Sequence, residues 1–118
     1  MTVQGFYNAI DGDYDEILGR LVTEDRIKKF LKKMLDTDDM TSLKEAWGKG
    51  DGKQIFAYSH RLKGIAQNLS LTHLIDKASF LTEAFRNGPA QDMDAASTMY
   101  RALCEDYETI ADFISQIE

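Results

Sequence analysis

The sequence contains one cysteine, one proline and no long apolar run. A single cysteine excludes a disulfide framework and a zinc site built from cysteines, and it is typical of a reducing compartment. No stretch approaches the roughly 18 apolar residues that a membrane span requires. The first residues, Met1 to Tyr14, lack the cationic flank and apolar segment of a signal peptide. We therefore expect a cytoplasmic protein that does not enter a membrane.

Basic residues are also in the minority: 14 Lys and Arg stand against 20 Asp and Glu, so the formal net charge is −6. This balance argues against a non-specific nucleic-acid binder, which requires a basic face. The length of 118 residues fits one domain, spanning 1–118, and a hydrophobic fraction of 43% is enough for a folded core.

Apolar residues recur at helical spacing along nearly the whole chain, and the strict alternation of β-strands is absent. Breaks are few, and the clearest is Asn87-Gly88-Pro89, where proline cannot continue a helix. Because the connections are short, consecutive helices should be antiparallel neighbours, which predicts an all-α, up-and-down helical bundle. The predicted helices lie near Tyr14–Leu21, Thr23–Leu35, Thr41–Lys49, Gly52–Leu69, Thr72–Asn87 and Asp92–Ile117.

Two short segments imitate ligand-binding loops but have the wrong residues at critical positions. Asp11–Glu16 begins like a calcium loop, yet its sixth residue is not glycine and the twelfth, Val22, is not glutamate. Gly48–Gln54 resembles a phosphate loop, but Trp47 stands where that motif needs glycine, and Gln54 stands where it needs Ser or Thr. With two histidines and one cysteine in the chain, we also expect no metal site.

Two other features have ordinary structural explanations. Cys104 lies among apolar residues of the last predicted helix, so we expect a buried structural thiol. A basic cluster in the helix Thr23–Leu35 is expected to be a solvated face of that helix. Its members are Arg26, Lys28, Lys29, Lys32 and Lys33.

The predicted helix Gly52–Leu69 has two distinct faces at 100° per residue. One is a core stripe of Ile55, Ser59, Leu62, Ala66 and Leu69. The face turned away from the core carries Phe56, His60, Lys63, Gly64 and Gln67. Glycine inside a helix costs about 1 kcal/mol relative to alanine. Nothing on an exposed face requires it, so Gly64 suggests that a partner approaches closely beside His60, and Phe56 can add an apolar contact to that docking surface.

The run Ser59–Ser70 resembles the signature of histidine-containing phosphotransfer (HPt) domains, which reads approximately Ala-His-x-Leu-Lys-Gly-x4-Leu-Gly. The matching residues are His60, Leu62, Lys63, Gly64 and Leu69. Ser59 replaces the usual alanine, and Ser70 replaces the glycine that usually ends the helix. The second departure leaves the end of this helix open, because a serine can instead cap the following helix.

The resemblance implies a four-helix bundle with additional short N-terminal helices. It also implies a phosphorelay intermediate, in which His60 accepts a phosphoryl group from a receiver-domain aspartyl phosphate and passes it to another receiver. Lys63 and Gln67 are the expected phosphoryl-stabilising residues, and Phe56 and Gly64 the receiver-docking residues. The expected partners are response-regulator receivers and a hybrid sensor histidine kinase. We expect a monomer that binds no cofactor, with Mg²⁺ on the receiver.

Other interpretations remain open. A non-catalytic helical adaptor would dock receivers without relaying phosphate. The dimerisation domain of a histidine kinase is less consistent, because it typically has an acid directly after the histidine and a nearby proline, whereas here Arg61 follows His60 and the only proline is Pro89. The second histidine, His73, lacks the Lys-Gly context, and we expect it to be an ordinary surface residue.

Overall fold

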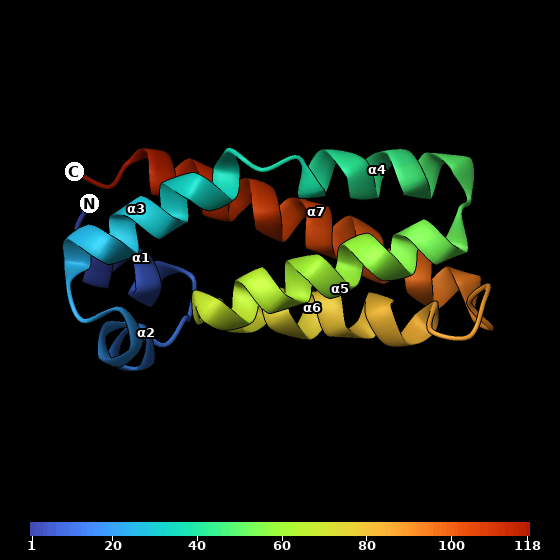
Figure 1. The fold of residues 1–118 in the computed structure, drawn as a ribbon, viewed down its shortest axis with the longest axis horizontal. Coiled ribbons are helices and arrows are strands. Elements are labelled where there is room, and N and C mark those ends of the chain that lie inside the picture. The colour runs from blue at the N-terminus through green and yellow to red at the C-terminus, as the bar shows by residue number, and fades with distance from the viewer.

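The computed structural model describes residues 1–118 and consists of seven α-helices (Figure 1). They are α1 (Val3–Ala9), α2 (Tyr14–Leu21), α3 (Glu24–Leu35), α4 (Asp39–Lys49), α5 (Gly52–Asn68), α6 (Thr72–Ala84) and α7 (Met93–Ser115). None of them combines the length and the apolar character that a membrane crossing requires.

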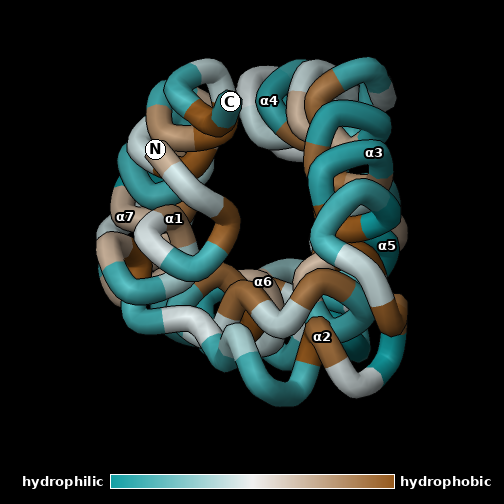
Figure 2. Tube along the Cα trace, turned by 90° about the vertical axis from the view of Figure 1, so that its left-hand side faces the viewer, coloured by the Kyte–Doolittle hydropathy of each residue, from teal (hydrophilic) through white to brown (hydrophobic).

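Four antiparallel rods form the bundle. The first rod is α3 followed end to end by α4, and α5, α6 and α7 then run back and forth along the same axis (Figure 1). Viewed down that axis, α4, α5, α6 and α7 surround a common centre (Figure 2), and α1 and α2 lie at one end of the bundle (Figure 1). The molecule measures 41 × 21 × 19 Å. The predicted all-α four-helix bundle with short N-terminal helices is therefore confirmed.

Local sequence explains where most helices begin. In five of the seven, a Thr or Asp side chain accepts a hydrogen bond from the backbone N–H three residues later, which satisfies a donor that has no partner inside the helix. These capping residues are Thr2, Asp13, Thr23, Asp51 and Asp92.

The sequence analysis missed α1 and misplaced several helix ends. Helix α1 has only 7 residues, of which Val3, Phe6 and Tyr7 are buried. So short a helix is stabilised by tertiary packing, which a periodicity search does not detect. Helix α6 ends at Ala84, three residues before the predicted Asn87, and the segment up to the proline forms turns. Other ends differ by one or two residues.

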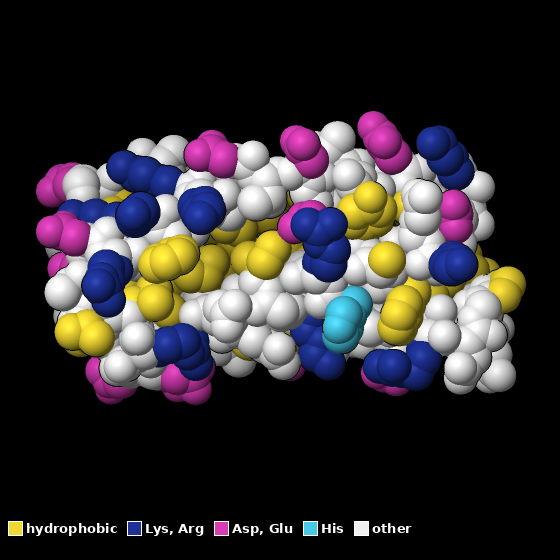
Figure 3. Space-filling view, viewed as in Figure 1, with side chains coloured by type: hydrophobic (Ala, Val, Ile, Leu, Met, Phe, Trp, Pro, Cys, Tyr) yellow, Lys and Arg dark blue, Asp and Glu magenta, His cyan; other side chains and the backbone are white.

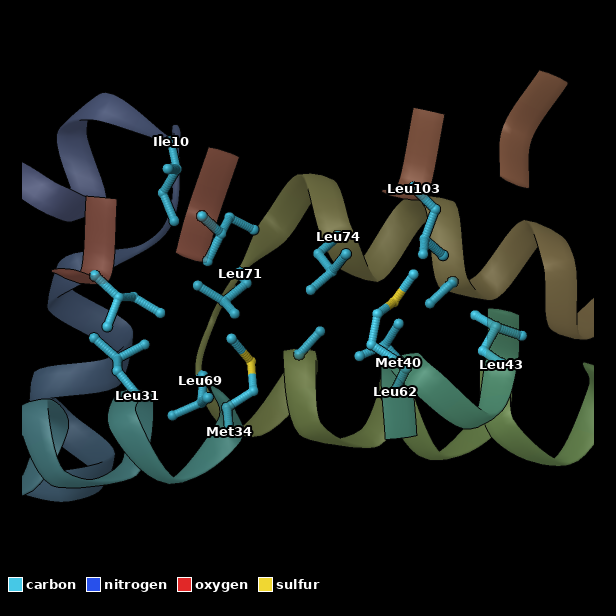
Figure 4. Close-up of a cluster of buried hydrophobic side chains, with 14 of the residues drawn as sticks. Ile10, Leu31, Met34, Met40, Leu43, Leu62, Leu69, Leu71, Leu74 and Leu103 are labelled. Carbon is cyan, nitrogen blue, oxygen red and sulfur yellow. The ribbon is translucent and has the colours of Figure 1, made fainter. Parts of the chain in front are cut away.

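The core is formed by 26 buried hydrophobic residues. Figure 4 shows Leu31, Leu43, Leu62, Leu74 and Leu103, which come from five different helices and point toward the same interior. The predicted core stripe of α5 is buried in full. Burial of that stripe fixes the rotation of α5 about its axis, so the opposite face must point outward.

Helix α5 ends in a left-handed residue, although that residue is not glycine. Ser70 has φ 55°, a conformation that costs most residues energy and that glycine usually supplies. The Leu71 N–H donates to the Ala66 carbonyl at 3.0 Å and the Ser70 N–H to the Gln67 carbonyl at 3.2 Å, which is the Schellman pattern. Ser70 therefore closes α5 and does not cap α6, whose N-cap is Leu71.

The buried side chain of Ser70 is held by α2. Its hydroxyl donates to Glu16 Oε1 at 2.6 Å and accepts from Arg20 Nη1 at 3.2 Å. Arg20 Nη2 also donates to Glu16 Oε1 at 3.3 Å. The hydrogen bonds that Glu16 accepts from Ser70 and Arg20 lower the pKa of its carboxyl group. The left-handed conformation of a serine is thus compensated by contacts that a glycine could not make.

The two N-terminal helices also satisfy the last carbonyl groups of α5. Arg20 Nη1 donates to the Asn68 carbonyl at 2.6 Å and to the Gln67 carbonyl at 3.2 Å. The hydroxyl of Tyr7 donates to the buried Leu69 carbonyl at 2.7 Å. A cation at the C-terminal end of a helix is also favoured by the helix dipole. Helices α1 and α2 therefore act as a cap on α5.

Tyr7→Phe is expected to lower the free energy of unfolding by about 1–2 kcal/mol, because the buried Leu69 carbonyl loses its donor. Tyr14→Phe is the matched control, since that hydroxyl bonds to Glu24 Oε1 at 2.6 Å in an exposed position, and its loss should be smaller. Urea denaturation of both variants measures the difference. Equal losses would contradict the capping role of Tyr7.

Candidate functional site

The outer face of α5 carries every site residue predicted from the sequence. His60 and Gln67 are exposed, while Phe56, Lys63 and Gly64 are half-buried. The expectation that this face is exposed is therefore only partly met, and Phe56 also packs against the core cluster. Positions three, four and seven residues apart lie on one helix face, so the five residues form one continuous surface.

The imidazole of His60 is open to solvent. Neither ring nitrogen forms a hydrogen bond within the protein, and the ring lies nearly parallel to that of Phe56, with the centroids 6.0 Å apart and the planes at 9°. Figure 3 shows a histidine exposed on the visible face, with Lys or Arg side chains above and below it. A nitrogen lone pair at this position is accessible to an electrophile carried by another molecule.

Lys63 is the cation of this face that has no acidic partner at ion-pair distance. It lies near enough to Glu83 that its charge helps to lower the pKa of that carboxyl, after the larger effect of the hydrogen bonds from Arg86. Lys63 lies one helical turn from His60 and forms no ion pair. Its ammonium group is therefore close enough to interact with a negative charge on the imidazole.

Two arginines that the sequence analysis did not assign to the site also lie near this surface. Arg61 Nη2 pairs with Oδ1 of the buried Asp39, at the start of α4, at 3.1 Å. Arg86, beyond the end of α6, binds Glu83 through two hydrogen bonds of 2.6 and 3.0 Å. Arg86 is distant in sequence from His60, so no local pattern predicts its place beside α5.

Gly64 has no internal reason to be glycine. A Cβ atom built on it meets nothing within 4 Å, and its backbone does not have a positive φ. The surface of α5 beside His60 is therefore bare backbone, open to an approaching molecule. Gln67, also on this face, makes no side-chain hydrogen bond within the protein. Its position lies about 10.5 Å from His60 along the helix axis, against about 4.5 Å for Lys63.

A buried polar contact fixes α5 to α6 directly behind the histidine. Ser59 Oγ and Thr82 Oγ1 lie 3.2 Å apart, at hydrogen-bond distance. Ser59 Oγ also lies 3.2 Å from the Phe56 carbonyl and Thr82 Oγ1 lies 2.8 Å from the Ala78 carbonyl, so the two hydroxyl protons serve three contacts. Both side chains are fully buried. Ser59, which replaces the alanine usual before the histidine, thus gains a specific partner. No local pattern in the sequence predicts this pair, because Thr82 is far from Ser59 in the chain.

An apolar groove of about 390 Å³ opens where α2, α3 and α5 meet. Phe30 stands at this groove and is 40% exposed. Ile65 of α5 and Leu69, just after its end, line the groove, and Arg20 and Lys33 add positive charge to the lining. Its complete lining is Arg20, Leu21, Phe30, Lys33, Met34, Thr37, Ile65, Asn68 and Leu69. Three helices contribute to it, so no single segment of sequence reveals it.

A family model described as Hpt domain matches residues 28–117. This stretch includes most of α3 and all of α4 to α7, with the whole outer face of α5. The chain belongs to the Hpt domain family. No curated protein and no solved structure matched the chain in the two other comparisons. The resemblance carried by the Ser59–Ser70 run is thereby confirmed, while α1 and α2 lie outside the matched stretch.

Membership places this chain among the domains of phosphorelay signalling, which interact with receiver domains and kinases. In this Hpt domain, His73 is exposed, and its Nε2 lies 3.4 Å from Asp11 Oδ2, at the end of the bundle beside α1. No group of three or more His, Cys, Asp or Glu is arranged to hold a metal ion.

Two structural expectations have different outcomes. Cys104 is half-buried instead of fully buried, and burial raises the pKa of its thiol. The basic residues of α3 form no ion pair, and all except the half-buried Lys28 are exposed, which confirms a solvated basic face.

Gly64→Ala is expected to raise the free energy of unfolding of this Hpt domain by about 0.5–1 kcal/mol, because alanine is the better helix former and the space is empty. Gly48→Ala in α4 is the matched control, since a Cβ there also meets nothing within 4 Å. Both variants should gain stability in urea denaturation. A loss at Gly64 alone would show that the fold itself requires this glycine.

Proposed function

We propose that this Hpt domain is a phosphorelay intermediate that carries the phosphoryl group on His60. The group arrives from an aspartyl phosphate on one receiver domain and leaves to the aspartate of another. The observation that carries the proposal is the exposed imidazole of His60, free of hydrogen-bond partners, beside Lys63 and the bare backbone of Gly64. These residues lie within the stretch that matches the Hpt domain family.

The proposed transfer is an in-line displacement at phosphorus. A neutral imidazole nitrogen, Nε2 in this proposal, attacks with its lone pair and forms the P–N bond. The bond from phosphorus to the aspartyl oxygen breaks, and the receiver regains a free carboxylate. The second transfer reverses these changes on another receiver. Phosphoryl transfer depends mainly on positioning and charge neutralisation, and the proposal assigns Mg²⁺ and most of that machinery to the receiver.

Lys63 and Gln67 are the proposed phosphoryl-stabilising residues. Phosphorylation adds about −1.5 to −2 charges to a chain whose formal net charge is already −6. Lys63 offsets part of this charge from one turn away, and the Gln67 amide can donate a hydrogen bond from the next part of the same face. An exposed ion pair is worth only about 0–1 kcal/mol, so these residues tune the phosphorylated state.

Receiver docking is assigned to the α5 face and the groove beside it. Phe56 supplies an apolar contact, and Gly64 allows the receiver backbone to approach closely. The groove at α2, α3 and α5 extends the apolar surface beyond Gln67, and its Phe30 is partly exposed. In this proposal the partners are response-regulator receivers and a hybrid sensor histidine kinase. The chain works as a cytoplasmic monomer that binds neither nucleic acid nor membrane.

His60→Gln is expected to abolish labelling by phosphorylated receiver domains, because glutamine has no nucleophilic ring nitrogen. A panel of receivers with Mg²⁺ is incubated with wild type, His60→Gln and the control His73→Gln. Gels run at neutral to alkaline pH preserve phosphohistidine, which is labile in acid. His73→Gln should be labelled like wild type. Label on His60→Gln would refute the assignment, and binding of a receiver without any labelling of wild type would favour an adaptor.

Phe30→Ala is expected to weaken binding of a receiver that labels wild type by about tenfold, because a partly exposed aromatic at an interface contributes on the order of 1–2 kcal/mol. Phe80→Ala in α6 is the matched control, since the two rings are 40% and 42% exposed. Isothermal titration calorimetry gives both dissociation constants. Equal effects of the two variants would exclude the groove from the docking surface.

A further inference from the structure

The geometry of α5 directs the His60 ring toward Phe56. In a helix, long side chains lean back toward the N-terminus and lie over the residue four positions earlier. Phe56 occupies that position for His60. The two rings are nearly parallel, with planes at 9° and centroids 6.0 Å apart, which lies within the range of favourable aromatic pairs. One face of the imidazole is therefore turned toward a neighbouring ring.

The Phe56 ring is held by several contacts within the protein, whereas the His60 ring contacts only Phe56 among the aromatic and hydrogen-bonding groups. The Phe56 side chain is half-buried and packs against the core cluster. The guanidinium of Arg86 lies 5.4 Å from its ring centroid and is itself held by two hydrogen bonds to Glu83. The Phe56 carbonyl accepts from the buried Ser59. His60, in contrast, is exposed and has no hydrogen bond to either nitrogen.

We propose that Phe56 is a positioning residue for the phosphoryl transfer, a role additional to receiver docking: its ring holds the plane of the His60 imidazole so that the reacting nitrogen points away from α5. This inference rests on the proposed function of His60. A receiver presents its phosphoryl group in a fixed position, so an imidazole already in the productive orientation loses less rotational freedom on reaction. Many functional histidines are oriented by a hydrogen bond to one ring nitrogen. In this site the contact with the Phe56 ring would orient the imidazole instead.

The experiment compares Phe56→Leu and Phe56→Tyr with wild type. Leucine keeps apolar bulk but has no flat ring, whereas tyrosine keeps the ring. Single-turnover transfer at saturating concentrations of a labelling receiver should be about three- to fivefold slower in Phe56→Leu and within about twofold of wild type in Phe56→Tyr. Because Phe56 also belongs to the proposed docking surface, receiver affinity is measured separately for both variants, and the saturating receiver keeps any loss of affinity out of the transfer rate. Phe80→Leu is the control for loss of a ring elsewhere and should leave the rate unchanged.

Two measurements separate positioning from other effects. NMR should show upfield ring-current shifts of the His60 ring protons, and contacts to the Phe56 ring, in wild type and Phe56→Tyr but not in Phe56→Leu. Phosphoramidate, a small phosphodonor that can approach from any direction, should label all three proteins at similar rates. That result shows that the nucleophile itself is intact.

The outcomes distinguish this inference from the relay itself. Unchanged single-turnover rates in Phe56→Leu, or His60 ring shifts that do not depend on Phe56, would overturn the positioning role. A change confined to receiver affinity would assign Phe56 to docking alone and would also overturn it. Labelling of wild type by phosphoramidate but by no receiver would refute the relay, whereas the NMR comparison would still decide whether Phe56 orients the imidazole.

Discussion

The buried stripe of α5 is the constraint on which the rest of the structure depends. Ile55, Leu62 and Ala66 are almost completely inaccessible, and rotating α5 enough to bury His60 would expose them to water. Since burial of a large aliphatic side chain is worth about 1.5–3 kcal/mol, such a rotation is strongly unfavourable. The histidine is therefore held outward by the hydrophobic core, and the contact between Ser59 and Thr82 fixes α5 against α6 at the same level.

The end of α5 has a second, polar constraint. The final carbonyl groups of a helix have no partner within it, and here Tyr7 and Arg20 donate to them while Ser70 turns the chain. These donors belong to α1 and α2, which lie outside the stretch matched by the Hpt domain family. The N-terminal helices thus stabilise the C-terminal end of α5, and α2 also forms one wall of the adjoining groove.

Electrostatics at the site differ from those of the whole chain. The protein is acidic, with a formal net charge of −6, yet Arg61, Lys63 and Arg86 lie on or beside the α5 surface that carries His60. Arg61 and Arg86 are held by Asp39 and Glu83, so their charges are partly neutralised and fixed in place. Lys63 remains without an acidic partner at ion-pair distance. A local excess of positive charge also attracts an acidic partner without giving the chain a basic surface.

The sequence by itself determined the helical class, the outward face of α5 and the five residues on it, because helical periodicity and glycine cost are local properties. It did not determine α1, which depends on packing of Phe6 and Tyr7, or the groove built by three helices. Nor did it determine that Ser70 closes α5. That outcome required Glu16 and Arg20 to approach from α2, and such long-range hydrogen bonds exist only once the tertiary structure has brought distant segments together.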